Sequence, residues 1–235
     1  MIISIINQKG GVGKTTTAVS LAGRFSKMEK MTLLVDLDPQ ANATVAFGLK
    51  ENIEPFQIVN QGKYLDIMPA SKKLSFLEPT LPQDYVQNIL KDRNDEFIII
   101  DCPPVLNNLS VNAIYAAEFL IIPVLSADFY SLVGLKDIFR AITSVNPEGD
   151  YRVLLTNLNE RLAITAHFIE KIIEAIQRDK IFTTGIRIDS KLREAPFAGI
   201  PINIYDVNSK GSLNYGDLSL EIIKLTGEKH GKTQI

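Results

Sequence analysis

The residues with the clearest chemistry lie in one loop near the N-terminus, Lys9-Gly10-Gly11-Val12-Gly13-Lys14-Thr15-Thr16. Glycines allow several backbone N–H groups to turn toward one anion without Cβ clashes. A helix that starts directly after such a loop adds positive partial charge at its N-terminus. Lys14 then suits the outer phosphates of a nucleotide, and the Thr15 hydroxyl suits a Mg²⁺ ion. The loop therefore predicts nucleotide binding.

The sequence departs from the standard phosphate-binding pattern at the first position of that pattern. The pattern G-x-x-x-x-G-K-[ST] requires glycine at position 8, where this chain has Gln8. A second lysine, Lys9, follows directly. A glycine-rich turn with incidental lysines is the alternative reading, and the strand before and helix after the loop disfavour it.

Two apolar runs farther along the chain end in carboxylates. Asp36 and Asp38 follow residues 33–35, and Asp101 follows residues 97–100. In α/β folds, ligands bind at the carboxyl ends of the strands, so these carboxylates are expected beside the glycine loop. Asp101 suits a Mg²⁺ shell, held through water. Asp38-Pro39 taken alone is equally consistent with a turn that ends a strand.

Composition excludes several classes of protein. The 235 residues are 46% hydrophobic and 22% charged, which favours a globular chain. The single cysteine, Cys102, excludes an intrachain disulfide framework and the paired cysteine ligands of an iron–sulfur reductase. The net charge of −2 leaves nucleic-acid binding dependent on a local basic patch. With neither a signal-peptide pattern nor a long apolar run, the chain is expected to be soluble and cytoplasmic.

Short apolar runs alternate with helical patterns along the chain, and one domain over residues 1–235 is the simplest organisation. Most of these runs are continuous in Ile, Leu and Val, the pattern of parallel strands buried on both faces. We therefore expect a doubly wound α/β fold, with a mostly parallel sheet flanked by helices. The expected strands are 2–6, 32–35, 64–68, 97–100, 119–124 and 152–155, and the expected helices are 15–28, 85–91, 109–117, 130–145, 163–178 and 212–225.

Taken together, these motifs resemble the ParA/MinD family of deviant Walker A P-loop ATPases, and most closely its Soj-like ParA members. The resemblance implies ATP and Mg²⁺ as ligands and an ATP-dependent sandwich homodimer. It implies that Lys9 is the signature lysine, which reaches phosphates on the partner subunit. It also implies that Asp38 positions the attacking water and that Asp36 lies near the Mg²⁺, with Thr15 and Asp101 in the metal site.

The second half of the chain carries weaker matches to the same family. The resemblance implies that Asn157 and Asp206 border the adenine, although Asn157 is equally suited to cap the next loop. Residues 191–196 resemble the V-R-L-S-E-A-P segment of partition proteins, which implies DNA contacts by Arg187, Lys191 and Arg193. Taken alone, three such cations more often belong to a solvated face.

The leading hypothesis is an ATPase that is slow until a partner stimulates it, and that segregates a plasmid or chromosome. The ATP dimer would bind DNA non-specifically on the nucleoid, and a ParB-type centromere-binding adaptor would stimulate hydrolysis and release. The chain starts at its first strand, so no N-terminal helix-turn-helix extension is expected. One alternative is a related ATPase that positions a protein cargo. Another is a MinD-like membrane-associated regulator, which the polar tail at 226–235 disfavours.

Overall fold

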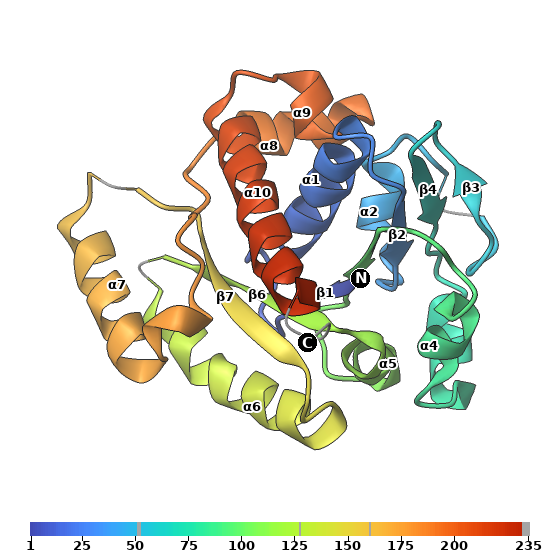
Figure 1. Cartoon of the computed structure of the whole chain (residues 1–235), viewed down its shortest axis with the longest axis horizontal. Helices are drawn as coiled ribbons and strands as arrows, with labels where there is room; N and C mark the ends of the chain where they lie inside the picture. The colour runs from blue at the N-terminus through green and yellow to red at the C-terminus, as the bar shows by residue number, and fades with distance from the viewer. Residues whose placement is uncertain (51–52, 127, 160, 232–235) are drawn as a thin grey trace.

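The computed structural model describes residues 1–50, 53–126, 128–159 and 161–231. Its centre is a seven-stranded sheet in the order β3-β4-β2-β5-β1-β6-β7 (Figure 1). All neighbouring strands pair in parallel except β3 and β4, which are antiparallel. The strands are β1 (Ile2–Ile5), β2 (Thr32–Asp36), β3 (Val59–Asn60), β4 (Leu65–Met68), β5 (Phe97–Asp101), β6 (Phe119–Leu125) and β7 (Asp150–Thr156). The predicted mostly parallel α/β sheet is confirmed.

Helices cover both faces of this sheet (Figure 1). One face carries α4 (Tyr85–Leu90), α5 (Asn108–Ala116), α6 (Phe129–Val145) and α7 (Ala163–Ala175). The other carries α1 (Lys14–Lys27), α2 (Asn42–Val45), α8 (Lys191–Glu194), α9 (Ile202–Tyr205) and α10 (Lys210–Gly231). The remaining short elements are α3 (Leu74–Leu77), η1 (Glu78–Thr80), η2 (Arg178–Lys180) and η3 (Ala195–Ala198).

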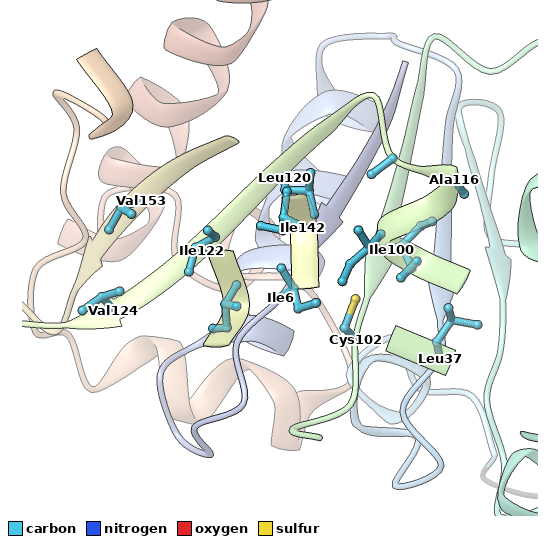
Figure 2. Packing of buried hydrophobic residues seen from close by; sticks show 14 of the residues in the cluster. Ile6, Leu37, Ile100, Cys102, Ala116, Leu120, Ile122, Val124, Ile142 and Val153 are labelled. Carbon is cyan, nitrogen blue, oxygen red and sulfur yellow. The ribbon is translucent and has the colours of Figure 1, made fainter. Parts of the chain in front are cut away.

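Two hydrophobic clusters hold these layers together because successive strand residues point to opposite faces. On β5, Ile98 and Ile100 join the cluster under α4 to α7, whereas Ile99 packs under α1 and α10. This explains the uninterrupted apolar runs in the sequence. Cys102 is a small buried residue that lies in the first cluster beside Ile100 (Figure 2). Burial raises the pKa of its thiol.

The register of the central strands sets the site. Asp36 at the end of β2 lies beside Asp101 at the end of β5, and Ile5 of β1 lies on the other side of Asp101. Both carboxylates and the glycine loop that follows β1 therefore leave the sheet at the same edge. The tertiary fold thus brings together motifs that are far apart in the sequence.

Some element ends differ from the prediction. The helix predicted over 163–178 ends at Ala175, because Ile176 has an extended backbone (φ −133°, ψ 139°), and residues 178–180 form a separate turn. The final helix was expected to stop near Gly227, and α10 instead runs to Gly231. Within the described residues, no helix is both long and apolar enough to cross a membrane.

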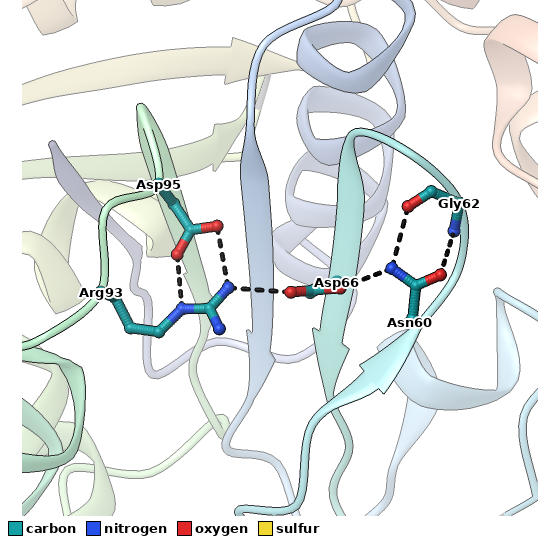
Figure 3. A network of polar contacts seen from close by, with 5 residues as sticks. All are labelled: Asn60, Gly62, Asp66, Arg93 and Asp95. Atoms are coloured by element: carbon teal, nitrogen blue, oxygen red, sulfur yellow. Dashed lines mark hydrogen bonds and ion pairs between the residues drawn. The ribbon is translucent and has the colours of Figure 1, made fainter.

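Residues 53–62 and 70–83 hold only short elements, including the edge strand β3. A polar network fixes this edge (Figure 3). Arg93 donates to both carboxylate oxygens of Asp95 (2.6 and 2.9 Å) and to Asp66 of β4 (2.9 Å). Asp66 also accepts from Asn60 of β3 (3.0 Å). The network joins the loop before β5 to β4 and β3, on the far side of the sheet from β7.

Candidate functional site

The glycine loop lies between β1 and α1, as predicted, and its backbone is left-handed at two positions. Gly11 has φ +74° and Gly13 has φ +92°, conformations that L side chains rarely adopt. A Cβ at Gly10 or Gly11 would meet no atom within 4 Å, so the loop is open above its backbone. Gly13 precedes α1 without a side-chain cap, so the N–H groups at the helix start face an open site suited to an anion.

Two buried polar side chains hold this loop in place through hydrogen bonds. Asn7 donates to the Pro123 carbonyl (2.6 Å) and accepts from the Lys9 N–H (2.9 Å). Thr156, at the end of β7, donates to the Val12 carbonyl (2.9 Å). The loop is therefore fixed to β6 and β7 as well as to its own strand, which preorganises its backbone donors.

Lys14 is buried at the start of α1, with 6% of its surface exposed. Its ammonium donates to the Lys9 carbonyl (3.2 Å), so the side chain folds back along the loop. Burial lowers the Lys14 pKa, while Asp101 and Asp38 act in the opposite direction. A buried cation with one neutral partner at this position suits the phosphates of a nucleotide.

Asp36 and Asp38 have fixed positions beside Lys14. One Asp36 oxygen accepts from the Asp38 N–H (3.1 Å), and the other accepts from the backbone N–H and hydroxyl of Thr44 (both 2.8 Å). Asp38 accepts from the Gln40 N–H (3.0 Å). Burial raises the pKa of Asp36 to about 6 and also raises that of Asp38. Asp36 therefore orients the turn that carries Asp38.

Asp101 differs from both, because it is fully buried and, among the described residues, neither of its oxygens accepts a hydrogen bond of good geometry. Burial raises its pKa well above the ordinary value, and neighbouring Asp36 raises it further. The Thr15 side chain lowers this pKa, because its hydroxyl lies close to the Asp101 carboxylate. A buried carboxyl without a partner costs free energy, and a hydrated cation at this place would satisfy it.

These residues fit a magnesium nucleotide better than a metal held by the protein alone. Within the described residues, no group of three His, Cys, Asp or Glu side chains could hold a metal ion. Mg²⁺ commonly takes one or two protein ligands and fills its shell with water and phosphate oxygens. Thr15 and Asp101 supply such a pair. Asp36 adds charge nearby, although its two oxygens already accept protein hydrogen bonds.

Lys9 forms an ion pair with Asp128 of the same chain. Asp128 lies in the segment between β6 and α6, and about a third of the Lys9 side chain is exposed. The lysine is thus held at the surface of the loop, away from the buried carboxylates. Sequence reasoning missed Asp128, because nothing in the sequence pairs positions 119 residues apart.

A cavity of about 290 Å³ continues from the loop along the ends of β6 and β7. Asn157 lines it in a left-handed conformation (φ +56°), and its carbonyl accepts from Ser126 (2.9 Å). Buried Tyr215 of α10 lines it too, hydrogen-bonded to Thr17 of α1 (3.0 Å). The cavity extends the phosphate loop toward Asn157, in the direction where a nucleotide base would lie.

The remaining predicted residues occupy different places. Arg187 and Arg193 line this same cavity. Lys191 is paired with Glu194 (2.7 Å), and Glu194 also accepts from Tyr205 (2.9 Å). The structure places Asp206 outside the lining of the cavity. Its carboxylate instead closes a turn by accepting from the Asn208 N–H (3.2 Å).

Several supporting residues had no recognisable signal in the sequence. Asn7, Thr44 and Thr156 are buried polar side chains that hold the loop and the Asp36 turn. Asn107, which stands where the family pattern has glycine, caps α5 by accepting from the Ser110 N–H (3.2 Å).

Comparison with known proteins identifies the family. A family model described as an AAA domain matches residues 1–156. The chromosome partitioning protein ParA of Myxococcus xanthus is 34% identical over an alignment of 260 positions. The alignment covers all of this chain and 92% of that protein. The chain belongs to the ParA/MinD family of ATPases. The sporulation initiation inhibitor protein Soj of Bacillus subtilis is 36% identical over 94% of this chain and 97% of its own length.

The fold comparison agrees with this membership. A structure described as cobyrinic acid a,c-diamide synthase from Mycobacterium smegmatis, with bound ADP and magnesium, matches with a TM-score of 0.80. The match covers 98% of this chain and 96% of that chain at 23% sequence identity. At that identity the likeness shows the shared P-loop fold.

Proposed function

We propose that this chain, over residues 1–235, is an ATP-hydrolysing partition protein. ATP with Mg²⁺ closes a homodimer, the dimer binds DNA non-specifically, and hydrolysis stimulated by a ParB-type adaptor releases it. The observation that supports the ATPase most directly is Asp101, which lies buried near Lys14 and the open glycine loop with no hydrogen bond of good geometry among the described residues. The relatives named as partitioning proteins support the cellular role.

The residues of the site divide the work of phosphoryl transfer. The loop N–H groups and Lys14 bind the phosphates, while Thr15 and Asp101 hold the metal shell. Bound Mg²⁺ neutralises charge that develops on the phosphate oxygens. Asp38 orients the attacking water, and Asp36 fixes the turn that carries Asp38 through the Asp38 N–H. Because Lys14 and the three carboxylates are buried and already positioned, little reorganisation of these side chains is needed when the nucleotide arrives.

Dimerisation supplies the remaining cation. In the free chain, Lys9 is paired with Asp128. In the proposed dimer, Lys9 leaves that pair and contacts phosphates bound to the partner subunit. A cation supplied across an interface offsets the charge on the transferring group, as an arginine finger does. Each site is then incomplete without its partner, so ATP occupancy and dimerisation are coupled.

We also propose that the protein is cytoplasmic and associated with the nucleoid. It would bind DNA through cations in the second half of the chain. Residues 165–235 contain 10 Lys or Arg and 9 Asp or Glu, so one subunit is only weakly basic there. A dimer places two such faces on one duplex, and contacts to phosphates add. Arg187 and Arg193 lie at the mouth of the nucleotide cavity, where bound ATP would change their surroundings.

The proposal is tested with wild type and Asp38→Ala. With saturating ATP and Mg²⁺, Asp38→Ala should form a stable dimer that hydrolyses ATP poorly, measured by light scattering after gel filtration and by phosphate release. Wild type should bind unrelated duplexes more tightly with ATP than with ADP, and added salt should weaken that binding. A monomeric Asp38→Ala protein at saturating ATP would overturn the sandwich mechanism. Equal affinity for the duplex with ATP and with ADP would overturn the partition cycle.

A further inference from the structure

Thr44 lies on the short helix α2, which begins directly after the turn that carries Asp38. The Thr44 side chain is fully buried. Its hydroxyl and its backbone N–H both donate to Asp36 at the end of β2. The same hydroxyl accepts from the N–H of Ala70, which follows the end of β4. Thr44 therefore joins the Asp38 turn to the ends of two neighbouring strands of the sheet.

The direction of each hydrogen bond at the Thr44 hydroxyl is fixed. A hydroxyl has one proton and two lone pairs. The Thr44 oxygen accepts from the Ala70 N–H (2.9 Å), so its own proton is left for the Asp36 carboxylate (2.8 Å). The Thr44 N–H donates to the same Asp36 oxygen (2.8 Å). Hydrogen bonds to an ionised carboxylate are stronger than those between neutral groups, so β4 holds Asp36 firmly through Thr44.

Asp36 passes this constraint to the turn that carries Asp38. Its second oxygen accepts from the Asp38 N–H (3.1 Å), and the Asp38 carbonyl accepts from the Ala41 N–H (2.8 Å). Ala41 has φ +55° and ψ +30°, a left-handed conformation that residues other than glycine rarely adopt. A turn with such strain keeps its shape only where the contacts around it hold it. Asp36 and Thr44 supply contacts of this kind.

The contacts of Thr44 concern hydrolysis rather than nucleotide binding. The phosphate loop with Lys14 lies between β1 and α1, and other residues, Asn7 and Thr156, hold it. In the proposed function, Asp38 orients the attacking water, and a displacement of about 1 Å in a group that positions a reactant can cost about 100-fold in rate. Loss of the Thr44 hydroxyl should therefore slow hydrolysis and leave ATP binding nearly unchanged.

We propose that Thr44 is a positioning residue for ATP hydrolysis, acting through Asp36 to hold Asp38 in place for the attacking water. This inference rests on the proposed function and adds to it a residue that need not contact the nucleotide. The hydroxyl is the group that matters, because it alone connects Asp36 to the Ala70 N–H.

The test uses Thr44→Val, which replaces the hydroxyl by a methyl group of similar size. With Mg-ATP and protein in excess over ATP, the single-turnover rate of hydrolysis should fall about 10- to 100-fold. The Kd for ATP, measured by fluorescent nucleotide titration, should stay within about threefold of wild type. Thr44→Val should also form the ATP-dependent dimer, as is expected of Asp38→Ala.

Thr32→Val is the matched control. Thr32 is buried at the other end of β2, and its hydroxyl donates to the Lys30 carbonyl (2.8 Å). Both valine variants lose a buried hydroxyl and should unfold at temperatures about 2 to 8 °C below wild type. Only Thr44→Val should lose hydrolysis. Thr44→Ser keeps the hydroxyl, so its rate should be within about threefold of wild type.

The outcomes separate this inference from the proposed function. Wild type that binds ATP without hydrolysing it contradicts the proposed function itself. A wild-type rate in Thr44→Val, or an equal loss in Thr32→Val, overturns the role of Thr44 alone. A parallel loss of ATP affinity in Thr44→Val would also overturn it. If Thr44→Val does not fold, Thr44→Ser decides. A rate near wild type supports the hydroxyl, and a loss of more than about tenfold shows that packing of the methyl group sets the rate.

Discussion

Two charged regions of this chain differ in how they hold charge. At the carboxyl edge of the sheet, buried Lys14 lies near Asp38 and Asp101, Asp36 lies beside Asp101, and burial shifts the pKa of each of these groups. In the second half of the chain, cations such as Arg161 and Lys210 stand exposed. Buried charges need exact partners, whereas exposed charges tolerate many arrangements.

The difference indicates how each region works. The carboxyl edge holds three acids against one lysine, so it is incomplete until a cation and phosphates enter, and binding there should be specific. In the proposed function the exposed cations contact a phosphate backbone, so their contribution should depend on salt and on how many cations meet the ligand.

Removal of the buried lysine should have the largest effect. Lys14→Ala should weaken ATP binding by at least about 100-fold, because a buried charge pair with phosphate is lost and three acids remain. Fluorescent nucleotide titration measures this change. Lys72→Ala, at an exposed position, is the control and should bind ATP as wild type does. Retained ATP affinity in Lys14→Ala would show that the buried cation does not hold phosphate.

The second prediction concerns protons at the carboxyl edge. The pKa of Asp36 is raised to about 6, and burial raises that of Asp101 well above its ordinary value, so the ligand-free chain binds protons that its unfolded form has lost. The stability from these groups is therefore complete below the ordinary carboxyl pKa of about 4, and it is lost as pH rises through about 6 and above. Mg²⁺ binding needs the ionised Asp101, so binding should release a proton.

Calorimetry in two buffers of different ionisation enthalpy measures that proton release. The affinity for Mg-ATP should increase roughly tenfold between about pH 5 and pH 7. Asp101→Asn should abolish the Asp101 part of the proton release while leaving the chain folded. An affinity that falls with rising pH, or binding without proton release in wild type, would contradict the assignment of Asp101.

The third prediction concerns the ion pair of Lys9 with Asp128, which is partly exposed. Asp128→Asn should release Lys9 and strengthen ATP-dependent dimerisation about two- to fivefold, because partly exposed pairs are worth less than about 1 kcal/mol. Sedimentation equilibrium with ATP measures the change. Asp137→Asn, an exposed acid on α6, is the control. Weaker dimerisation in Asp128→Asn alone would show that the pair supports the dimer.

The smallest effect is expected from the exposed lysine of α8. Lys191→Ala should reduce duplex affinity less than about threefold, because the Lys191 ammonium is already paired with Glu194. Filter binding or fluorescence anisotropy at one salt concentration, with ATP, measures it. A loss of about tenfold or more in Lys191→Ala would mean that the Lys191 ammonium contacts DNA despite its pair with Glu194.

The sequence analysis predicted the central strands and the glycine loop well because their signals are local. Continuous Ile, Leu and Val runs require burial on both faces, and the structure shows it for β5. Helix ends were less predictable. α7 stops at Ala175 and α10 continues to Gly231, because packing and backbone conformation, rather than side-chain type, decide where a helix ends.

The candidate site shows the same difference between residues with a local sequence signal and residues placed by packing. The motif residues Lys14, Asp38 and Asp101 could be chosen from the sequence, because each follows a strand in a recognisable pattern. Asp128 could not be chosen, since its relation to Lys9 depends on β1 and β6 being neighbours in the sheet.

The sequence by itself determined the fold class, the family and the phosphate loop, because these depend on residues close together in the chain. The tertiary structure alone decided which charges are paired and which stand free. It paired Lys9 with Asp128 and Arg93 with Asp66, and it left Asp101 buried with no hydrogen bond of good geometry among the described residues. The physical reason is that charge pairing depends on distances of a few ångströms between distant segments, and only the packed sheet sets those distances.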